Sequence, residues 1–230
     1  MKKIRFTADA ELTHIQFDAP TPASKVVPEW YKDTPQFVNE DTRAKSWNST
    51  IKRCSPFLDA LSAGYSYVLA DDLEVTRNMA GVPTIKWRTS TDIISDHNPA
   101  QHPLLPIPQG FVQRVFKWNN QWTINTASGF SAFFTHPTNR YDLPFLTFSG
   151  IVDTDSYTQP VQFPFIIKED FEGIIERGTP VAQIIPIKRE AWTSEIMPYN
   201  KDTSLKEQRK FLGKIDRSYK TQWWIKKTYN

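Results

Sequence analysis

Cysteine and long apolar runs are scarce in this sequence. The single cysteine, Cys54, excludes an internal disulfide framework and a metal cluster built on cysteine. The surrounding IKRCSPFLDAL offers the thiol no evident basic partner, so we interpret Cys54 as a buried structural thiol and not as a nucleophile. No stretch has the apolar length of a signal peptide or of a membrane span. We therefore expect a protein of a reducing compartment with no membrane partner.

Glycine is also scarce, with eight residues in 230, whereas there are seventeen prolines. Because proline cannot donate to a β-ladder and interrupts helices, its abundance indicates many short strands with rigid connections. Strand-like alternation recurs at short spacing between residues 51 and 200, which is typical of an all-β sandwich or barrel. We predict a mainly β fold with three parts: an extended N-terminal arm (1–50), a β domain (51–200), and a basic helix with an aromatic tail (201–230).

Two short helices are predicted before the main run of strands. In PEWYKD, Pro28 stands where a helix misses no amide donor, so the residues after it suit a first helical turn. The segment CSPFLDAL likewise carries Pro56 near its start and favours a short helix. Residues 94–110 contain four prolines and no periodicity, which predicts a long irregular loop.

That loop contains the first candidate metal ligands. Asp96, His97 and His102 could present a carboxylate and two imidazoles to a metal ion. Their order and spacing match no standard ligand motif, and the surrounding prolines prevent presentation on one helical face. We therefore favour a solvated or locally hydrogen-bonded loop and predict no metal site.

Charge is unevenly distributed along the chain. Residues 201–230 contain nine Lys or Arg and three Asp or Glu, which gives this segment a charge of +6. The whole chain carries only +3, so the first 200 residues carry −3. A total of +3 is too small to indicate a nucleic-acid partner, and no finger spacing, stacking motif or recognition-helix signature is present.

The basic segment itself predicts an amphipathic helix that begins near Ser204, a residue suited to the N-cap. Such a helix could contact phosphates or an acidic protein surface, with Trp223 and Trp224 as interface anchors. It could equally pack on the β domain with its charged face in water. The expected apolar stripe is Leu205, Leu212, Ile215 and Tyr219, and the basic residues are Lys206, Arg209, Lys210, Lys214, Arg217 and Lys220.

Two stretches, GIVDTDSY at 150–157 and RGTPVAQIIPI at 177–187, together resemble the signature of the dUTPase and dCTP deaminase superfamily. In that superfamily G-[hydrophobic]-[IV]-D-x-x-Y-x-G opens a β-hairpin, and G-x-x-[IV]-A-Q-[hydrophobic] follows. The resemblance covers roughly residues 125–190 and implies a dUTPase-like β-clip, or distorted barrel, at the core. The matching positions are Gly150, Val152, Asp153, Tyr157, Gly178, Val181, Ala182 and Gln183.

The resemblance also implies a homotrimer with nucleotide sites between subunits. The aspartate at Asp153 would orient and deprotonate a water for attack on the α-phosphate, with Mg²⁺ on the phosphate chain. The tyrosine at Tyr157 would pack against the base and the sugar. The runs CSPFLDAL, HPTNR, GIVDTD and GTPVAQIIP are further similar to an uncharacterised protein family of phages and marine bacteria, which implies no function.

Several departures from the superfamily pattern fall on positions that carry its chemistry. Ser156 is inserted before the tyrosine, and Gln159 stands where a glycine would let the base approach the backbone. Pro180 replaces the arginine of the second turn, and Pro164 lies where the deaminase branch needs a glutamate. No P-R-S-S type phosphate motif and no glycine-rich lid are found. These departures argue against intact family chemistry.

Polar residues near the first stretch add to the candidate site. His136 and Arg140 precede it by about a dozen residues and could bind an anion. Alternatively, Arg140 pairs with Asp142 while His136 caps a turn, which is the reading we favour. Asp153 and Asp155 would face the same side of a strand, where they could share a proton or hold a divalent cation, or else lie in solvent at a strand end.

Three functions follow from these patterns. We predict first a degenerate, non-catalytic dUTPase-like protein that binds a small nucleotide-like ligand or a protein partner. The second is a structural or assembly protein, such as a component of a phage particle. The third is a Mg²⁺-dependent nucleotide hydrolase with a rewired phosphate site. The candidate catalytic residue is Asp153, and the candidate ligand-binding residues are Tyr157, Gln183, Asp155, Arg140 and His136.

Two of these functions make opposite structural predictions. A ligand-binding protein would keep polar groups converging near Asp153, Tyr157 and Gln183. An assembly protein would hold those side chains in ordinary strand-end hydrogen bonds and bury Trp223 and Trp224 against a neighbour. We expect a homo-oligomer, with a trimer favoured. We also expect a location in the cytoplasm of a bacterial host cell, or in a virion if the protein is structural.

Overall fold

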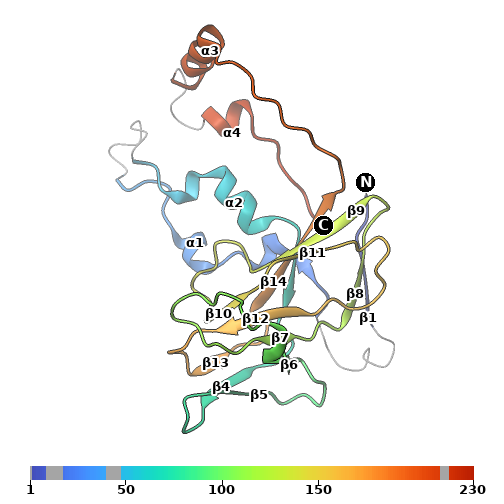
Figure 1. The fold of residues 1–230 in the computed structure, drawn as a ribbon. Helices are drawn as coiled ribbons and strands as arrows, with labels where there is room; N and C mark the ends of the chain where they lie inside the picture. Colours follow the sequence, from blue (N-terminus) through green and yellow to red (C-terminus); the bar gives the residue numbers. More distant parts are fainter. Residues whose placement is uncertain (1, 9–17, 40–47, 213–217) are drawn as a thin grey trace.

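The computed structural model describes residues 2–8, 18–39, 48–212 and 218–230 (Figure 1). Within these residues fourteen strands form four antiparallel sheets, and helices are few and short. The prediction of a mainly β fold is therefore confirmed. None of the helices in these ranges is both long and apolar enough to span a bilayer.

The largest sheet has five strands and brings the two motif stretches together. Its central strand, β14, is flanked by β9 and β3, and its first five residues, PVAQI, are all buried. Because β11 also pairs with β9, GIVDTDSY and RGTPVAQIIPI lie in one sheet with a single strand between them. The strand order is β11 (Gly150–Val152), β9 (Phe130–Thr135), β14 (Pro180–Lys188), β3 (Tyr65–Val68) and β2 (Thr21–Pro22).

A second sheet of four strands packs its aromatic residues into the core. Trp118 stacks on Phe165 with ring centroids 3.5 Å apart, and both side chains are fully buried. The indole Nε1 of Trp118 donates to Thr147 Oγ1 (3.0 Å), whose hydroxyl donates to the carbonyl oxygen of Val181 in β14 (2.6 Å). This chain of hydrogen bonds ties the two sheets together. The strands are β10 (Phe145–Thr147), β12 (Phe163–Ile167), β7 (Phe116–Trp118) and β6 (Ile94–Asp96).

Two smaller sheets complete the β body. The segment predicted as an extended arm over residues 1–50 supplies a strand to two sheets. Its β1 pairs with β8 in a small sheet, and its β2 pairs with β3 at the edge of the large sheet. Residues 94–96, predicted as part of an irregular loop, instead form β6, because they pair with β7. The small sheets are β1 (Arg5–Ala8) with β8 (Trp122–Asn125), and β13 (Gly173–Ile175), β4 (Leu73–Arg77) and β5 (Pro83–Lys86).

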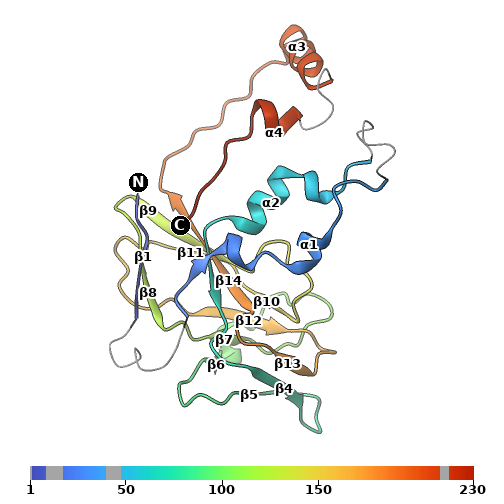
Figure 2. The same cartoon turned by 180° about the vertical axis from the view of Figure 1, so that it is seen from behind.

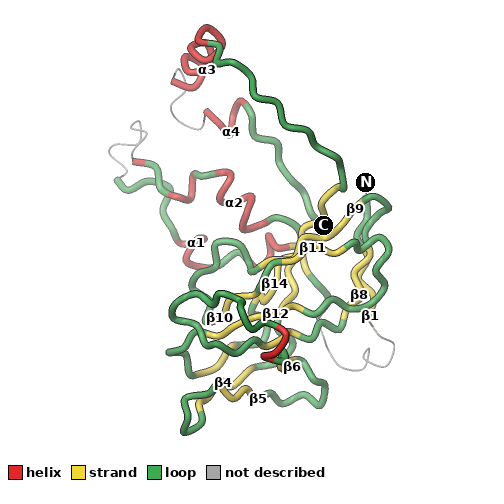
Figure 3. The backbone as a smooth tube through the Cα atoms, viewed as in Figure 1, coloured by secondary structure: helices red, strands yellow, loops and turns green. Residues whose placement is uncertain are grey.

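The two predicted short helices are present beside the β body (Figure 3). Helix α1 follows Pro28, and α2 has a proline in its first turn. Cys54, just before α2, is half-buried, less than the buried thiol we predicted. The helices are α1 (Glu29–Asp33), α2 (Ser55–Ser62), α3 (Lys201–Leu212) and α4 (Ser218–Gln222), with 3-10 turns η2 (Ala23–Val26), η5 (Ile51–Arg53) and η6 (Pro99–Gln101).

The passage from α2 into β3 requires Gly64. This residue has φ +67°, a left-handed conformation that glycine adopts at little expense. A Cβ atom at this position would lie 2.0 Å from the carbonyl oxygen of Ile184, so the close approach to β14 also excludes a side chain. The helix can therefore turn directly into the sheet.

The chain beyond β14 forms a long excursion, which we call the C-terminal arm (residues 189–230). Figures 1 and 2 show it projecting from the β body as an extended limb, with α3 and α4 at its far end, before the chain returns along a second limb. Helix α3 begins at Lys201, so the predicted N-cap at Ser204 is wrong. Ser204 N instead donates to the carbonyl oxygen of Asn200, a residue type that also favours helix starts. Ile215 of the expected apolar stripe lies outside the described residues.

Candidate functional site

Asp153 and Asp155 meet one cation, Arg189, at the root of the C-terminal arm. Arg189 Nη1 lies 3.2 Å from Asp153 Oδ1 and 2.9 Å from Asp155 Oδ1, and its Nη2 donates to the second oxygen of Asp155. Ser131 Oγ donates to Asp153 Oδ1 (2.7 Å), and Gly129 N donates to Asp155 Oδ2 (2.8 Å). The arginine is thus held by two carboxylates, one of them in a bidentate pair.

The two aspartates converge through a turn and not through strand periodicity. Strand β11 ends at Val152, so the expectation that Asp153 and Asp155 share one face of a strand is wrong. Thr154 between them is completely buried, and its hydroxyl lies 2.8 Å from that of Thr126. This contact fixes the turn and directs the carboxylates on either side toward Arg189.

The electrostatics of Asp155 favour an ion pair over a catalytic base. The hydrogen bond from Arg189, helped by the backbone N–H of Gly129, lowers the pKa of Asp155 to about 2. The same contact raises the pKa of Arg189. A carboxylate with so low a pKa binds a proton too weakly to act as an efficient general base near neutral pH. The pair is suited to anchoring the first residue of the arm.

Gln183 lies at the other end of β14 and is used inside the protein. Its side chain is buried, and its Oε1 accepts from Thr138 N (2.9 Å). Its Nε2 donates to the carbonyl oxygens of Ala60 (2.9 Å) and Ala63 (2.6 Å) at the end of α2. The adjoining cavity, which Arg140 also lines, has a volume of about 10 Å³, room for about one water molecule. Gln183 therefore fastens α2 to the sheet.

His136 and Arg140 form the turn arrangement that we favoured. Arg140 makes a bidentate pair with Asp142, with Nε 2.9 Å from Oδ1 and Nη2 2.9 Å from Oδ2. His136 Nε2 donates to the carbonyl oxygen of Arg140 (3.0 Å), while Nδ1 accepts from Thr147 N (3.3 Å). Burial lowers the pKa of His136, which keeps the imidazole in this neutral form.

The predicted site residues consequently fall into two separate groups. Gln183 and Arg189 are six residues apart in the sequence, a separation of about 20 Å along an extended chain. Tyr157 belongs to the acidic turn, where its backbone N–H donates to the carbonyl oxygen of Asp153 (2.9 Å) and the residue is 44% exposed. In the part of the chain that the structure describes, the residues named for a nucleotide cleft are split between the surroundings of Gln183 and the acidic turn at Asp153.

The last residue of β6, Asp96, likewise has a local partner. Asp96 pairs with Arg114, with Oδ1 3.0 Å from Nε and Oδ2 2.6 Å from Nη2. The rings of His97 and His102 meet edge to face, with centroids 5.4 Å apart. Across the described residues no group of three or more His, Cys, Asp or Glu side chains is placed to hold a metal ion.

The returning limb is anchored within the chain by Trp224, which is predicted as an interface anchor, and by residues that the sequence reasoning missed. Asp59 of α2 accepts from Trp224 Nε1 (2.8 Å) and from Lys227 Nζ (2.6 Å). Tyr65 OH donates to the carbonyl oxygen of Asn230 (3.1 Å). No local motif marks Asp59 or Arg189, because each meets its partners only through tertiary pairing. Two clamps, one on each limb, thus hold the arm to the β body.

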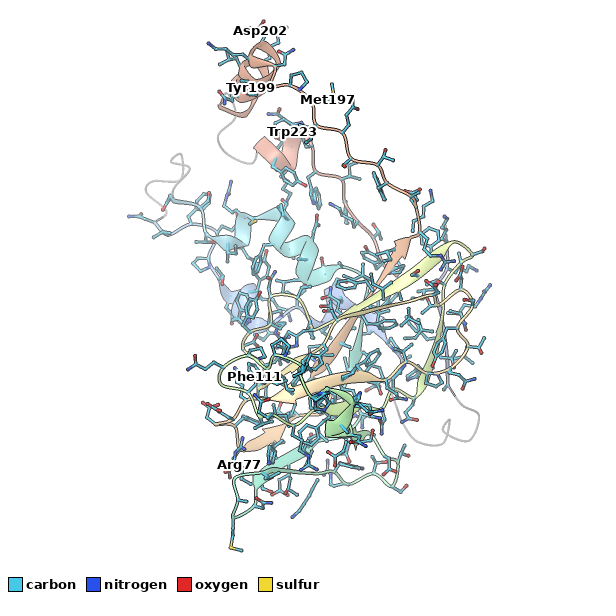
Figure 4. The ribbon with its side chains drawn as sticks, in the orientation of Figure 1. Arg77, Phe111, Met197, Tyr199, Asp202 and Trp223 are labelled. Carbon is cyan, nitrogen blue, oxygen red and sulfur yellow. The ribbon has the colours of Figure 1, made fainter. Side chains whose placement is uncertain are left out.

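Between its clamps the arm exposes large apolar side chains. Met197 and Tyr199 lie on the outgoing limb, and Trp223 on the returning one, all away from the β body (Figure 4). The exposed fractions are 85% for Trp192, 98% for Ile196, 69% for Met197 and 77% for Tyr199. This apolar segment was not among the predicted site residues, although its composition is visible in AWTSEIMPY.

Comparison with known proteins adds no family to these observations. A scan of the sequence against protein-family models finds no match, and a search of curated proteins finds none either. The dUTPase-like resemblance of residues 125–190 therefore stays a prediction.

Proposed function

We propose that this protein is a non-catalytic assembly protein whose C-terminal arm binds a second copy of the chain. The observation that carries the proposal is the run of exposed apolar side chains from Trp192 to Tyr199. Apolar groups gathered in this way on a surface mark interaction sites. Burial of each such side chain contributes about 1.5–3 kcal/mol, before the entropy lost on association is subtracted.

The two clamps suit the arm for this role. The outgoing limb is fixed where Arg189 meets its two aspartates, and the returning limb where Trp224 and Lys227 meet Asp59. A segment held at both roots has fewer conformations to lose on binding than a free tail has. Preorganisation of this kind increases affinity without adding contacts.

Charge complementarity favours a second copy as the partner. Residues 201–230 carry +6, and the first 200 residues carry −3, so each chain offers the opposite charge to its neighbour's arm. Lys201, Lys206 and Lys220 are exposed on the arm and available for such contacts. The homotrimer that the sequence resemblance implies is one closed form of an assembly built this way.

A dUTPase-like clip is compatible with this proposal as a fold without the family's chemistry. It is supported by the pairing of β11 and β14 with the same strand, β9. The residues expected to act on a nucleotide have structural partners instead: Asp155 anchors the arm and Gln183 anchors α2. Structural roles of this kind support an assembly protein, in a virion or in the cytoplasm.

The test compares the oligomeric state of the wild type with that of an arm variant. Trp192→Ser with Ile196→Ser removes two exposed arm side chains, and Met79→Ser with Leu104→Ser is the control, because both control residues are exposed outside the arm. Loss of about 3 kcal/mol of interface energy would weaken association more than 100-fold.

Sedimentation over a concentration series measures this difference, and thermal melts check that the variants remain folded. We expect the wild type and the control to associate at micromolar concentration and the arm variant to sediment as a monomer. A wild type that stays monomeric at 100 μM, or an arm variant that associates as the wild type does, would overturn the proposal.

A further inference from the structure

A cavity lies where the two limbs of the arm join the β body. Its volume is about 470 Å³, within the range of small-molecule sites in proteins. Its walls come from the first residues of the chain, from β3 and β14, from the segment leading into β9, and from the end of the returning limb. The lining includes Lys2, Lys3, Tyr65, Phe130, Pro186 and Tyr229.

Three of the eleven residues that line this cavity are aromatic. Tyr65 and Tyr229 meet edge to face, with ring centroids 6.1 Å apart, and Phe130 and Pro186 add further apolar surface. The hydroxyl of Tyr65 is engaged with the carbonyl oxygen of Asn230, so this residue offers its ring more readily than its polar end. Aromatic walls of this kind suit a flat, unsaturated ring in the ligand.

Two ammonium groups supply the polar recognition. Neither Lys2 nor Lys3 has a carboxylate of the described chain within ion-pair distance. Lys2 Nζ instead lies 3.8 Å from the centroid of the Phe130 ring, at the cavity wall. Two unpaired cations beside an apolar cavity produce a local positive potential, which attracts an anion.

We infer that this cavity binds a small planar anion, namely an aromatic ring that carries a phosphate or carboxylate group. The ring would lie among Tyr65, Phe130 and Tyr229, and the anionic group would lie at Lys2 and Lys3. None of the residues named earlier for a nucleotide cleft lines this cavity. The inference does not depend on the proposed assembly function, because it uses none of the exposed apolar side chains from Trp192 to Tyr199.

The test separates the contribution of the ring from that of the charge. Binding of 1-naphthyl phosphate to the full chain, without a tag at its N-terminus, is measured by isothermal titration calorimetry. 1-Naphthol supplies the ring alone, and inorganic phosphate supplies the charge alone. We expect 1-naphthyl phosphate to bind with a submillimolar Kd, and each of the other two probes at least tenfold more weakly.

Two double variants identify the site. Lys2→Gln with Lys3→Gln is expected to weaken binding of 1-naphthyl phosphate at least tenfold, whereas Lys25→Gln with Lys86→Gln, at exposed lysines elsewhere, leaves it unchanged. Tyr65→Leu is expected to weaken binding through loss of the ring wall. Absence of 1-naphthyl phosphate binding at 5 mM overturns the inference. So does 1-naphthol that binds as tightly as 1-naphthyl phosphate, or an unchanged affinity for 1-naphthyl phosphate in the Lys2 and Lys3 variant.

Discussion

The buried amide of Gln183 leads to a sharp stability prediction. Gln183→Met keeps the length of the side chain but removes one acceptor and two donors. Thr138 N and the carbonyl oxygen of Ala63 then lose the partners that Gln183 supplies, whereas the carbonyl oxygen of Ala60 still accepts from Thr138 Oγ1 (2.5 Å). Two backbone groups that are only partly accessible to water are left without this hydrogen bond.

The expected loss follows from those two groups. A buried donor or acceptor left without a partner costs about 1–3 kcal/mol. Because Thr138 and Ala63 are only half-buried, the lower part of that range applies, and we expect a loss of about 2–4 kcal/mol in the free energy of unfolding. For a chain of this size each kcal/mol lowers the Tm by roughly 2–4 °C, so the Tm should fall by roughly 5–15 °C.

Urea unfolding followed by tryptophan fluorescence measures the effect, and Gln159→Met, at an exposed glutamine, is the control. The control should unfold within about 0.5 kcal/mol of the wild type, as surface substitutions usually do. A loss below about 0.5 kcal/mol for Gln183→Met would refute the reasoning. It would indicate that the amide faces solvent or a ligand cleft in solution, as the superfamily resemblance implies.

Two further predictions concern acid stability and a tight turn. The pKa of Asp155 is about 2 in the folded chain, below its ordinary value of 3.8. The ionised carboxylate therefore stabilises the fold fully above about pH 4, and this stabilisation is progressively lost as the pH falls toward 2. Asp155→Asn should therefore flatten the dependence of the unfolding midpoint on pH between 5 and 2, and parallel profiles would contradict this. Gly64→Ala should destabilise the protein severely, because its Cβ would overlap a carbonyl oxygen of β14. The control is Gly129→Ala, which is also at positive φ but has open space around it, so it should show only the smaller backbone strain. Equal Tm values for the two variants would argue against the overlap.

Local patterns in the sequence predict much of the secondary structure. The abundance of proline and the alternating segments correctly indicate a mainly β fold, and Pro28 marks the start of α1. Ser204 is a misleading signal, because Asn200 satisfies the same helix-start preference four residues earlier. Strand β6 has only three residues, too few for alternation to be detected, and it exists because β7 offers a partner.

The candidate site was harder to predict, because its partners are set by strand pairing. Asp153 and Asp155 are close together in GIVDTDSY, but nothing local reveals that Arg189 approaches them. That approach depends on the register of β14 with β9, in which Lys188 lies opposite Phe130. The ligand role predicted for Gln183 rests on the superfamily resemblance alone, because its actual partners at the end of α2 are about 120 residues away in the sequence.

The closed course of the C-terminal arm has a consequence for how the protein can vary. The arm leaves from β14, and the returning limb meets Tyr65 of the adjacent strand β3, so the two roots of the excursion lie at neighbouring points of the body. The entropy of closing a flexible loop grows only with the logarithm of its length, at about 0.6 kcal/mol per doubling. Insertions or deletions between the clamps can therefore resize the reach of the arm, and with it the spacing between copies, while the β body keeps its stability.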